Sequence, residues 1–256
     1  MKVAIITSVY YPDDSLTKFD LVKKVLSIIP DYAGVDYDLF IMNDGVEDPR
    51  FHKFIKEYTP RGHYKNIKYT HRENKGITKS LNELLSQVDD TYDYICLLDL
   101  DVFVPVYWLK KCISVLNHNM EPGALGPARP LQNNGIGICG VLVQDKLSFN
   151  LESNICQTKE QVLFSLVDSI GGACLVFRAK ELKSYGWDET LISDHIDAYI
   201  ISRYRVDGKT TFAILDRGYH PREIYESEKF RDRKLVSFQK ELPKFYTILN
   251  NLNNNK

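Results

Sequence analysis

The sequence predicts an α/β fold in which a mostly parallel sheet carries helices on both faces. Apolar, β-branched runs of strand length recur along the first part of the chain, and amphipathic segments with helical spacing separate them. Each parallel connection needs a crossover segment, so this alternation indicates parallel strands. A third observation agrees: one long apolar run ends in two aspartates, and ligands in open α/β sheets bind where the strands end.

The first half of the chain supplies the regular alternation. Strands are expected at residues 3–9, 37–42 and 67–70, and in the run that starts at Tyr94. A first helix is expected to begin at Ser15, a candidate N-cap, and to end at Pro30. Two further helices are expected over residues 51–58 and 77–88.

The second half is less regular, and neither a repeat nor a linker separates it from the first. Helices are expected over residues 107–117, 179–185 and 193–205, and strands over residues 173–177 and 210–215. A Gly- and Pro-rich stretch, residues 121–140, interrupts the pattern. From Arg231 a tail mixes charged with apolar residues and ends in an Asn-rich stub that should fray.

Composition excludes several classes of protein. The chain has 256 residues, 33 of them basic and 34 acidic, so it lacks the basic excess that neutralises nucleic-acid phosphates. Its five cysteines show no C-x-x-C spacing, and Cys96 and Cys174 lie within apolar runs. We therefore expect no nucleic-acid partner, a reducing compartment and no zinc site.

The sequence also bears on location. No apolar run approaches the ~20 residues that span a membrane. The apolar segment among the first twelve residues is too short and too rich in β-branched residues for a signal peptide. A cytoplasmic protein is expected. Two roles stay open for the C-terminal tail, namely peripheral contact with a membrane and contact with a second copy of the chain.

The run from Tyr94 leads directly into Asp99-Leu100-Asp101, and Pro105 then stops strand pairing. Two carboxylates at the end of a buried strand need a neutralising cation, and hard ions such as Mg²⁺ or Mn²⁺ take oxygen ligands of this kind. The alternative is a strand that simply ends in a solvated acidic turn.

Several motifs in the right order give the chain a resemblance to the family 2 glycosyltransferases, from Val3 to about His220. Besides the opening strand with Thr7 and Ser8, the matching segments are FIMNDG (40–45), ENKGITKSLNELL (73–85), LLDLDVFVP (97–105), GGACLVFRAKELKSYGWDE (171–189) and SDHIDAYIISRYRVDGK (193–209). The spacing of Asp194 and Asp197 before Arg203 looks most like the rhamnosyltransferase branch.

The resemblance implies a GT-A fold, in which a Rossmann-like sheet adjoins a smaller mixed region on the acceptor side. Residues 1–230 would then form a single domain, divided into a nucleotide-binding half (1–105) and an acceptor-binding half (106–230), with residues 231–256 as a helical tail. The implied activity is transfer of a sugar, with inversion, from a nucleotide-diphosphate donor to a hydroxyl of a carbohydrate or glycoconjugate acceptor. Mn²⁺ or Mg²⁺ would be the cofactor.

Site residues follow from the resemblance by position. Asp197 would be the general base, Asp101 would ligate the metal, and His220 would be a further metal or diphosphate contact. Donor binding would fall to Thr7, Asp44, Asn74, Gly76, Lys79 and Asp99. The sugar and acceptor would be contacted by Gly172, Trp187, Asp188 and Asp194.

The sequence departs from the family pattern at Asn43, where an Asp is usual, at Ser193, where a Glu is frequent, and at Tyr199, which replaces a second carboxylate. Structural interpretations also stand beside the functional ones. Asp44 before Gly45 is ordinary turn chemistry, Asn74 and Gly76 can cap a helix, and glycines can serve tight packing. Tryptophans are more often core than sugar platforms, and helix acids are commonly solvated.

Three other functions are alternatives to sugar transfer. A haloacid-dehalogenase-like phosphatase also uses D-x-D, but it needs Thr or Val where Phe103 stands and places the motif on the first strand. A sugar nucleotidyltransferase needs a Gly-rich loop after strand one, which residues 10–18 do not provide. A non-catalytic sugar-binding protein on a transferase fold would have no reason to retain both Asp101 and Asp197.

Overall fold

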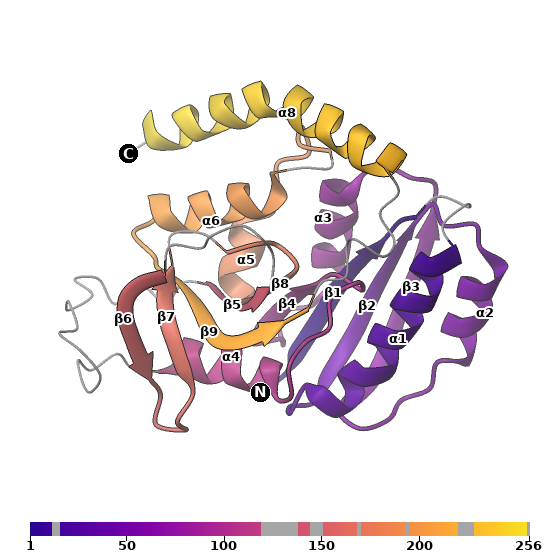
Figure 1. The fold of residues 1–256 in the computed structure, drawn as a ribbon, viewed down its shortest axis with the longest axis horizontal. Coiled ribbons are helices and arrows are strands. Elements are labelled where there is room, and N and C mark those ends of the chain that lie inside the picture. Colours follow the sequence, from indigo (N-terminus) through magenta and orange to yellow (C-terminus); the bar gives the residue numbers. More distant parts are fainter. Residues whose placement is uncertain are drawn as a thin grey trace.

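The computed structural model describes residues 1–11, 16–118, 138–143, 151–167, 170–192, 195–219 and 228–254. Within these residues the chain forms one nine-stranded sheet in the order β3-β2-β1-β4-β8-β5-β9-β7-β6, with helices on both sides (Figure 1). The predicted α/β class, with a mostly parallel central sheet, is confirmed.

The parallel half of the sheet contains β1 (Val3–Val9), β2 (Tyr37–Asp44), β3 (Tyr64–Arg72) and β4 (Tyr94–Leu98). Strand β1 lies between β2 and β4, because the chain passes from β1 to β2 and β3 on one side and then crosses to β4 on the other side. Such a reversal opens a crevice at the carboxyl ends of the strands. The central strands β1 and β4 are almost wholly buried, as their continuous apolar sequences require.

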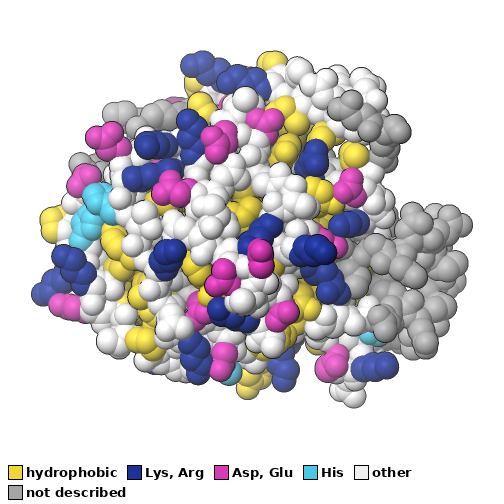
Figure 2. Space-filling model, turned by 180° about the vertical axis from the view of Figure 1, so that it is seen from behind, with side chains coloured by type: hydrophobic (Ala, Val, Ile, Leu, Met, Phe, Trp, Pro, Cys, Tyr) yellow, Lys and Arg dark blue, Asp and Glu magenta, His cyan; other side chains and the backbone are white. Residues whose placement is uncertain are grey.

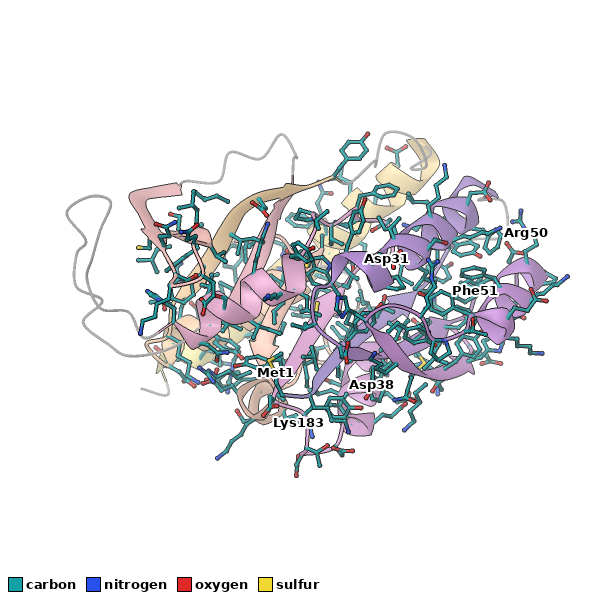
Figure 3. The ribbon with its side chains drawn as sticks, turned by 90° about the horizontal axis from the view of Figure 1, so that it is seen from below. Met1, Asp31, Asp38, Arg50, Phe51 and Lys183 are labelled. Atoms are coloured by element: carbon teal, nitrogen blue, oxygen red, sulfur yellow. The ribbon has the colours of Figure 1, made fainter. Side chains whose placement is uncertain are left out.

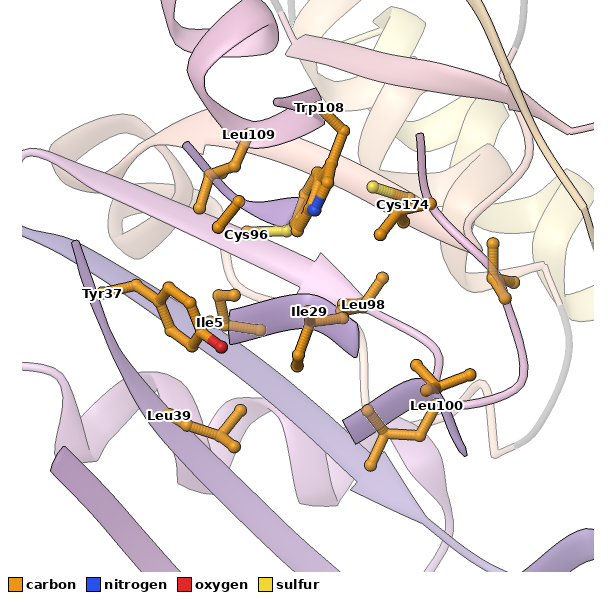
Figure 4. Packing of buried hydrophobic residues seen from close by; sticks show 14 of the residues in the cluster. Ile5, Ile29, Tyr37, Leu39, Cys96, Leu98, Leu100, Trp108, Leu109 and Cys174 are labelled. Carbon is orange, nitrogen blue, oxygen red and sulfur yellow. The ribbon is translucent and has the colours of Figure 1, made fainter. Parts of the chain in front are cut away.

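Alternate residues of these strands face two separate cores. Helices α1 (Leu16–Tyr32), α2 (Pro49–Glu57) and α4 (Trp108–Asn117) cover the face to which Ile5 and Cys96 point. Helices α3 (Ile77–Gln87), α5 (Ala179–Tyr185) and α6 (Ile196–Val206) cover the face of Ile6 and Ile95. Figure 4 shows the first core, where Trp108 packs beside Cys96 and Cys174. Both cysteines are fully buried, as the sequence predicts, and burial raises the pKa of Cys96.

The other half of the sheet is mixed. Strand β8 (Cys174–Arg178) runs antiparallel to β4, and β5 (Ile138–Val143), β9 (Thr211–Gly218), β7 (Leu163–Val167) and β6 (Leu151–Gln157) follow in that order. The sequence predicted β8 and β9 but missed β5, β6 and β7. Strand β5 begins inside the Gly-rich stretch and β6 contains the polar run Glu152–Asn154, so their sequence patterns are weak.

Helix α1 corrects one prediction, because Pro30 lies inside it and the helix continues to Tyr32. A proline removes the N–H that would bond the carbonyl four residues earlier. In this helix that carbonyl, Leu26 O, accepts a hydrogen bond from the Tyr58 hydroxyl at 2.5 Å. The lost backbone bond is therefore replaced from outside the helix.

The last helix, α8 (Glu228–Asn254), lies along α6 (Figure 1). The ring of Phe245 stacks on His195 with centroids 4.9 Å apart, and Glu241 accepts a hydrogen bond from Ile192 N at 3.1 Å. Among the helices of the described residues, none combines the length and apolar character needed to cross a bilayer. Acidic and basic side chains are interspersed on the face seen in Figure 2, in keeping with the near-balanced charge.

Candidate functional site

The chain places several predicted site residues at the carboxyl edge of the parallel strands. Thr7 lies near the end of β1, Asp44 is the last residue of β2, and Asp99 directly follows β4. The Thr7 side chain is fully buried, and no group among the described residues hydrogen-bonds its hydroxyl. This edge, at the reversal of strand order, is where an open α/β sheet binds ligands.

The turn that carries Asp99 and Asp101 is fixed by backbone hydrogen bonds from both sides. Asp99 N donates to Ala173 O at 2.9 Å, just before β8. Phe103 and Tyr219 exchange two backbone hydrogen bonds of 2.8 Å, just after β9. The two aspartates are thus held between the Gly171-Gly172 segment and the end of β9.

Asp101 forms an ion pair with Lys18 of α1. The two side chains are only 13% and 15% exposed, so each charge would be costly to leave alone. A carboxylate held against a cation at a strand end has the donor chemistry that a divalent ion needs, and Asp99 offers a second carboxylate in the same turn. The residues present therefore fit a metal, provided that the Lys18 ammonium moves aside. Sequence reasoning missed Lys18, because nothing in the pattern of an amphipathic helix distinguishes it.

Asp44 is 2% exposed and its carboxylate is already engaged. It accepts hydrogen bonds of 3.0 Å from Lys75 N and Gly76 N, and it pairs with Arg72 Nε at 3.0 Å. These contacts fix the connection from β3 to α3. The geometry favours an organising role for Asp44, and contact with a nucleobase through its remaining lone pairs stays a proposal.

Asn74 and Gly76 complete this connection. Asn74 Oδ1 accepts a hydrogen bond from Gly76 N at 3.1 Å, and Gly76 has a φ of 91°, which favours glycine. A Cβ on Gly76 would also meet Ile192 at 2.7 Å. Asn74 and Lys79 are both exposed, so their side chains are accessible to a ligand.

Asn43 makes contacts that an aspartate could not. Its Nδ2 donates to Val46 O and to the Tyr69 hydroxyl, both at 2.9 Å, while its Oδ1 accepts from Val46 N at 2.6 Å. An ionised carboxylate has no hydrogen to donate, so both donations would be lost. This local network explains why an amide stands where the family pattern has an acid.

Asp197 lies in the first turn of α6 and is held by two backbone groups. Its Oδ2 accepts from Gly172 N at 3.0 Å and its Oδ1 accepts from Ala198 N at 2.8 Å. The approach depends on glycine, because a Cβ at Gly172 would stand 3.0 Å from Asp197 Cβ. The structure thus brings together two residues that the sequence assigned separately.

The remaining predicted residues fall into three groups. Trp187 is only 4% exposed and packs in the core of α3, α5 and α6, which favours a packing role over sugar stacking. Asp188 Oδ1 accepts from Thr190 N and Thr190 Oγ1, so it organises the turn after Trp187. Asp194 and His220 lie outside the described residues, as does Ser193.

Comparisons with known proteins bear on the family resemblance and on the fold. A model of the family described as glycosyl transferase family 2 matches residues 20–135. This segment runs from α1 past α4 and includes Asp44, Asp99 and Asp101, which confirms the resemblance seen in the sequence. The rhamnosyltransferase branch stays a prediction.

Solved structures show that the GT-A fold extends beyond the family 2 segment. TarS residues 1–349 from S. aureus has a TM-score of 0.59 at 13% identity, with 86% of this chain and 60% of that chain covered. The mannosyltransferase PcManGT from Pyrobaculum calidifontis, in complex with GDP-Man and Mn²⁺, has a TM-score of 0.56 at 13% identity, with 97% and 68% covered.

A third similar structure is GalNAc-T7 with UDP, GalNAc and Mn²⁺, with a TM-score of 0.54 at 10% identity and with 86% of this chain and 43% of that chain covered. The chain therefore spans 60% of the TarS fragment and less than half of GalNAc-T7. No curated protein matched the chain in a sequence comparison.

Proposed function

We propose that this protein transfers a sugar, with inversion, from a nucleoside-diphosphate donor to a hydroxyl of a carbohydrate or glycoconjugate acceptor. The observation that carries the proposal is a short link between the two predicted reaction centres. Ala173 O accepts a hydrogen bond from Asp99 N, and the neighbouring Gly172 N donates to Asp197. One segment before β8 therefore fixes both the D-x-D turn and the acid of α6.

On the donor side, Asp101 and Asp99 would hold Mn²⁺ or Mg²⁺, and the unpartnered hydroxyl of Thr7 is available to a ligand. A divalent ion on the diphosphate would stabilise the charge of the leaving group as a Lewis acid. Lys18 lies at the same carboxylate and adds positive charge near the phosphates. His220 would add a further contact. The Mn²⁺ and nucleotides bound to PcManGT and GalNAc-T7 support this assignment.

On the acceptor side, Asp197 would take the proton of the attacking hydroxyl. Inversion requires attack from the face opposite the leaving group, so the base must stand across the sugar from the diphosphate. The hydrogen bonds from Gly172 N and Ala198 N orient the carboxylate and leave each oxygen with a further lone pair. General-base help of this kind contributes ~10²–10⁴-fold to rate.

The test is a panel of nucleotide sugars with Mn²⁺ or Mg²⁺, followed by release of the nucleoside diphosphate in the presence of glycan acceptors. Asp197→Asn should retain donor binding and lose turnover by ~10²-fold or more. Asp101→Asn should weaken metal-dependent donor binding itself. Asp90→Asn is the matched control, since Asp90 is 98% exposed and pairs with Lys183, and it should leave rates near those of the wild type.

Wild-type turnover in Asp197→Asn would refute the base assignment. Donor binding without turnover in the wild-type protein would instead favour a sugar-binding protein, and phosphate release from simple esters would favour a phosphatase.

Location and partners follow the same proposal. A cytoplasmic enzyme that uses soluble nucleotide sugars is expected. Helix α8 exposes Leu235, Val236, Phe238 and Tyr246, which supports the prediction that the tail contacts a membrane surface or a second copy of the chain.

A further inference from the structure

Three side chains at the outer edge of the sheet form a second cluster of potential metal ligands. Glu47 follows β2, His52 lies in the first turn of α2 and His71 lies near the end of β3. One ligand atom of each lies within 4.8 Å of the others, and among the described residues this is the group of three that could hold an ion. Cysteine spacing predicted no zinc site, but these ligands are histidines and a glutamate brought together by folding.

The cluster is distinct from the D-x-D site. Strands β3 and β4 are separated by β2 and β1. At about 4.8 Å per strand the two strands lie about 14 Å apart, too far for a side chain of one to share an ion with the other. The ligand chemistry also differs, because Asp99 and Asp101 offer only oxygen whereas this cluster offers two imidazoles.

We propose that Glu47, His52 and His71 bind a zinc-class divalent cation. Two histidines and a glutamate are a recognised donor set for Zn²⁺ with one position left open. Zinc bonds of about 2.0–2.1 Å place tetrahedral ligands about 3.3–3.4 Å apart. His71 Nε2 and Glu47 Oε1 are already 3.5 Å apart, so this edge of the tetrahedron needs almost no movement. The two imidazole centroids are 4.8 Å apart, so His52 would have to come closer to complete the tetrahedron.

The surrounding groups prepare His52 for this role. Its Nδ1 lies 3.0 Å from the Tyr69 hydroxyl, which in turn accepts a hydrogen bond from Asn43 Nδ2 at 2.9 Å. A polar partner on one ring nitrogen orients a histidine ligand and leaves the other nitrogen for the metal. The neighbouring Phe51 is fully buried and points into the core, which anchors this turn of α2 (Figure 3).

The fourth position would face solvent. An open pocket of about 470 Å³ adjoins the cluster and is lined by Glu47, Pro49, His52, Lys53, Lys56 and Glu57. It leaves room for water or a small anionic ligand on the ion, and Lys53 and Lys56 supply positive charge at its rim. The ion would fasten the β2–α2 connection to the end of β3.

The experiment titrates untagged, metal-stripped protein with Zn²⁺ by calorimetry, and with Co²⁺ as a spectroscopic probe. Wild-type protein should bind one Zn²⁺ saturably, give the intense visible Co²⁺ absorption of a four-coordinate site, and melt at a higher temperature with Zn²⁺. His71→Ala and Glu47→Gln should each weaken binding at least ~10-fold and remove the shift in melting temperature. Glu47 is 70% exposed, so its variant should fold normally.

His63→Ala is the matched control, because His63 is as exposed as His71, 36% against 37%, and also lies beside a carboxylate, Asp36. It should bind Zn²⁺ like the wild type, and so should Asp101→Asn. The proposal is overturned if wild-type protein shows no saturable Zn²⁺ binding, if His71→Ala and His63→Ala behave alike, or if Asp101→Asn rather than His71→Ala abolishes binding. In those cases Glu47 and His71 form only an ion pair at the surface.

Discussion

Asp197 packs closely against the position that a side chain at Gly172 would take. A Cβ there would lie 3.0 Å from Asp197 Cβ, closer than real Cβ contacts usually come. The neighbouring Gly171 has nothing within 4 Å of a Cβ position. The two adjacent glycines therefore differ. Only Gly172 is required for the close approach of Asp197.

This difference makes a prediction. Gly172→Ala should push Asp197 aside by a few tenths of an ångström and lower kcat measurably, by less than the ~10²-fold that a displacement of about 1 Å can cost. Gly171→Ala should leave kcat within a few-fold of wild type. Steady-state kinetics on the two variants makes the comparison, with circular dichroism as a check on folding. Equal losses in both would show that the segment matters for backbone freedom rather than for Asp197.

Lys18 compensates the charge of Asp101 in the absence of a metal, so the two cations should compete for this carboxylate. Lys18→Ala should raise the affinity of the D-x-D site for Mn²⁺, because the ion no longer competes with an ammonium. In the wild type, Mn²⁺ must first break the ion pair between Lys18 and Asp101. Each ~1.4 kcal/mol of free energy that this no longer costs should raise the Mn²⁺ affinity tenfold. Paramagnetic resonance of unbound Mn²⁺ measures the change, and Lys24→Ala, an exposed lysine of the same helix, is the control. Weaker Mn²⁺ binding in Lys18→Ala would contradict the exchange of Lys18 for a metal.

At the scale of elements, α1 illustrates how a tertiary contact repairs a local defect. The helix continues through Pro30 because Tyr58, which follows α2, supplies the hydrogen bond that the proline cannot. A helix-ending rule applied to the sequence cannot foresee this, since the donor comes from another element.

Tyr58→Phe should therefore lower the free energy of unfolding by about 1–3 kcal/mol, the cost of leaving a buried carbonyl unsatisfied. In a Pro30→Ala background the restored backbone N–H takes that carbonyl, and the same substitution should cost less. Urea unfolding of the four proteins gives the coupling energy between the two positions. Additive losses would mean that the Tyr58 hydroxyl does not compensate the proline.

At the scale of the whole molecule, α8 closes the core on the α6 side. Phe245 is 9% exposed and stacks on His195, whereas Tyr246 beside it is 56% exposed. The helix is thus joined to the domain through one apolar face, and its other face is exposed.

Phe245→Ala should destabilise the protein by about 3 kcal/mol, as for other buried phenylalanines. Tyr246→Ala should change stability by less than about 0.5 kcal/mol, the usual range for surface sites. Chemical denaturation followed by tryptophan fluorescence compares the two. A small effect at both positions would indicate that α8 does not pack on the domain in solution.

The sequence by itself determined the parallel half of the fold. Val3–Val9 and Ala179–Tyr185 were located to the residue, and Asp99 and Asp101 were placed at a strand end. These features are written in local patterns, because the period of apolar residues and the turn residues around them lie within one short segment. The motifs also sufficed to recognise the resemblance to glycosyl transferase family 2, whose model matches residues 20–135.

Tertiary structure alone decided how distant residues meet. Lys18 and Asp101 are 83 positions apart, Asp197 and Gly172 are 25 apart, and β8 enters the sheet antiparallel beside β4. The grouping of Glu47, His52 and His71 likewise depends on β2 and β3 being neighbours. Such pairings depend on strand order, direction and register. The spacing of apolar residues within one segment carries no information about these three properties. The counter-ion of Asp101 and the hydrogen bond from Gly172 to Asp197 could therefore be identified only once the path of the chain was known.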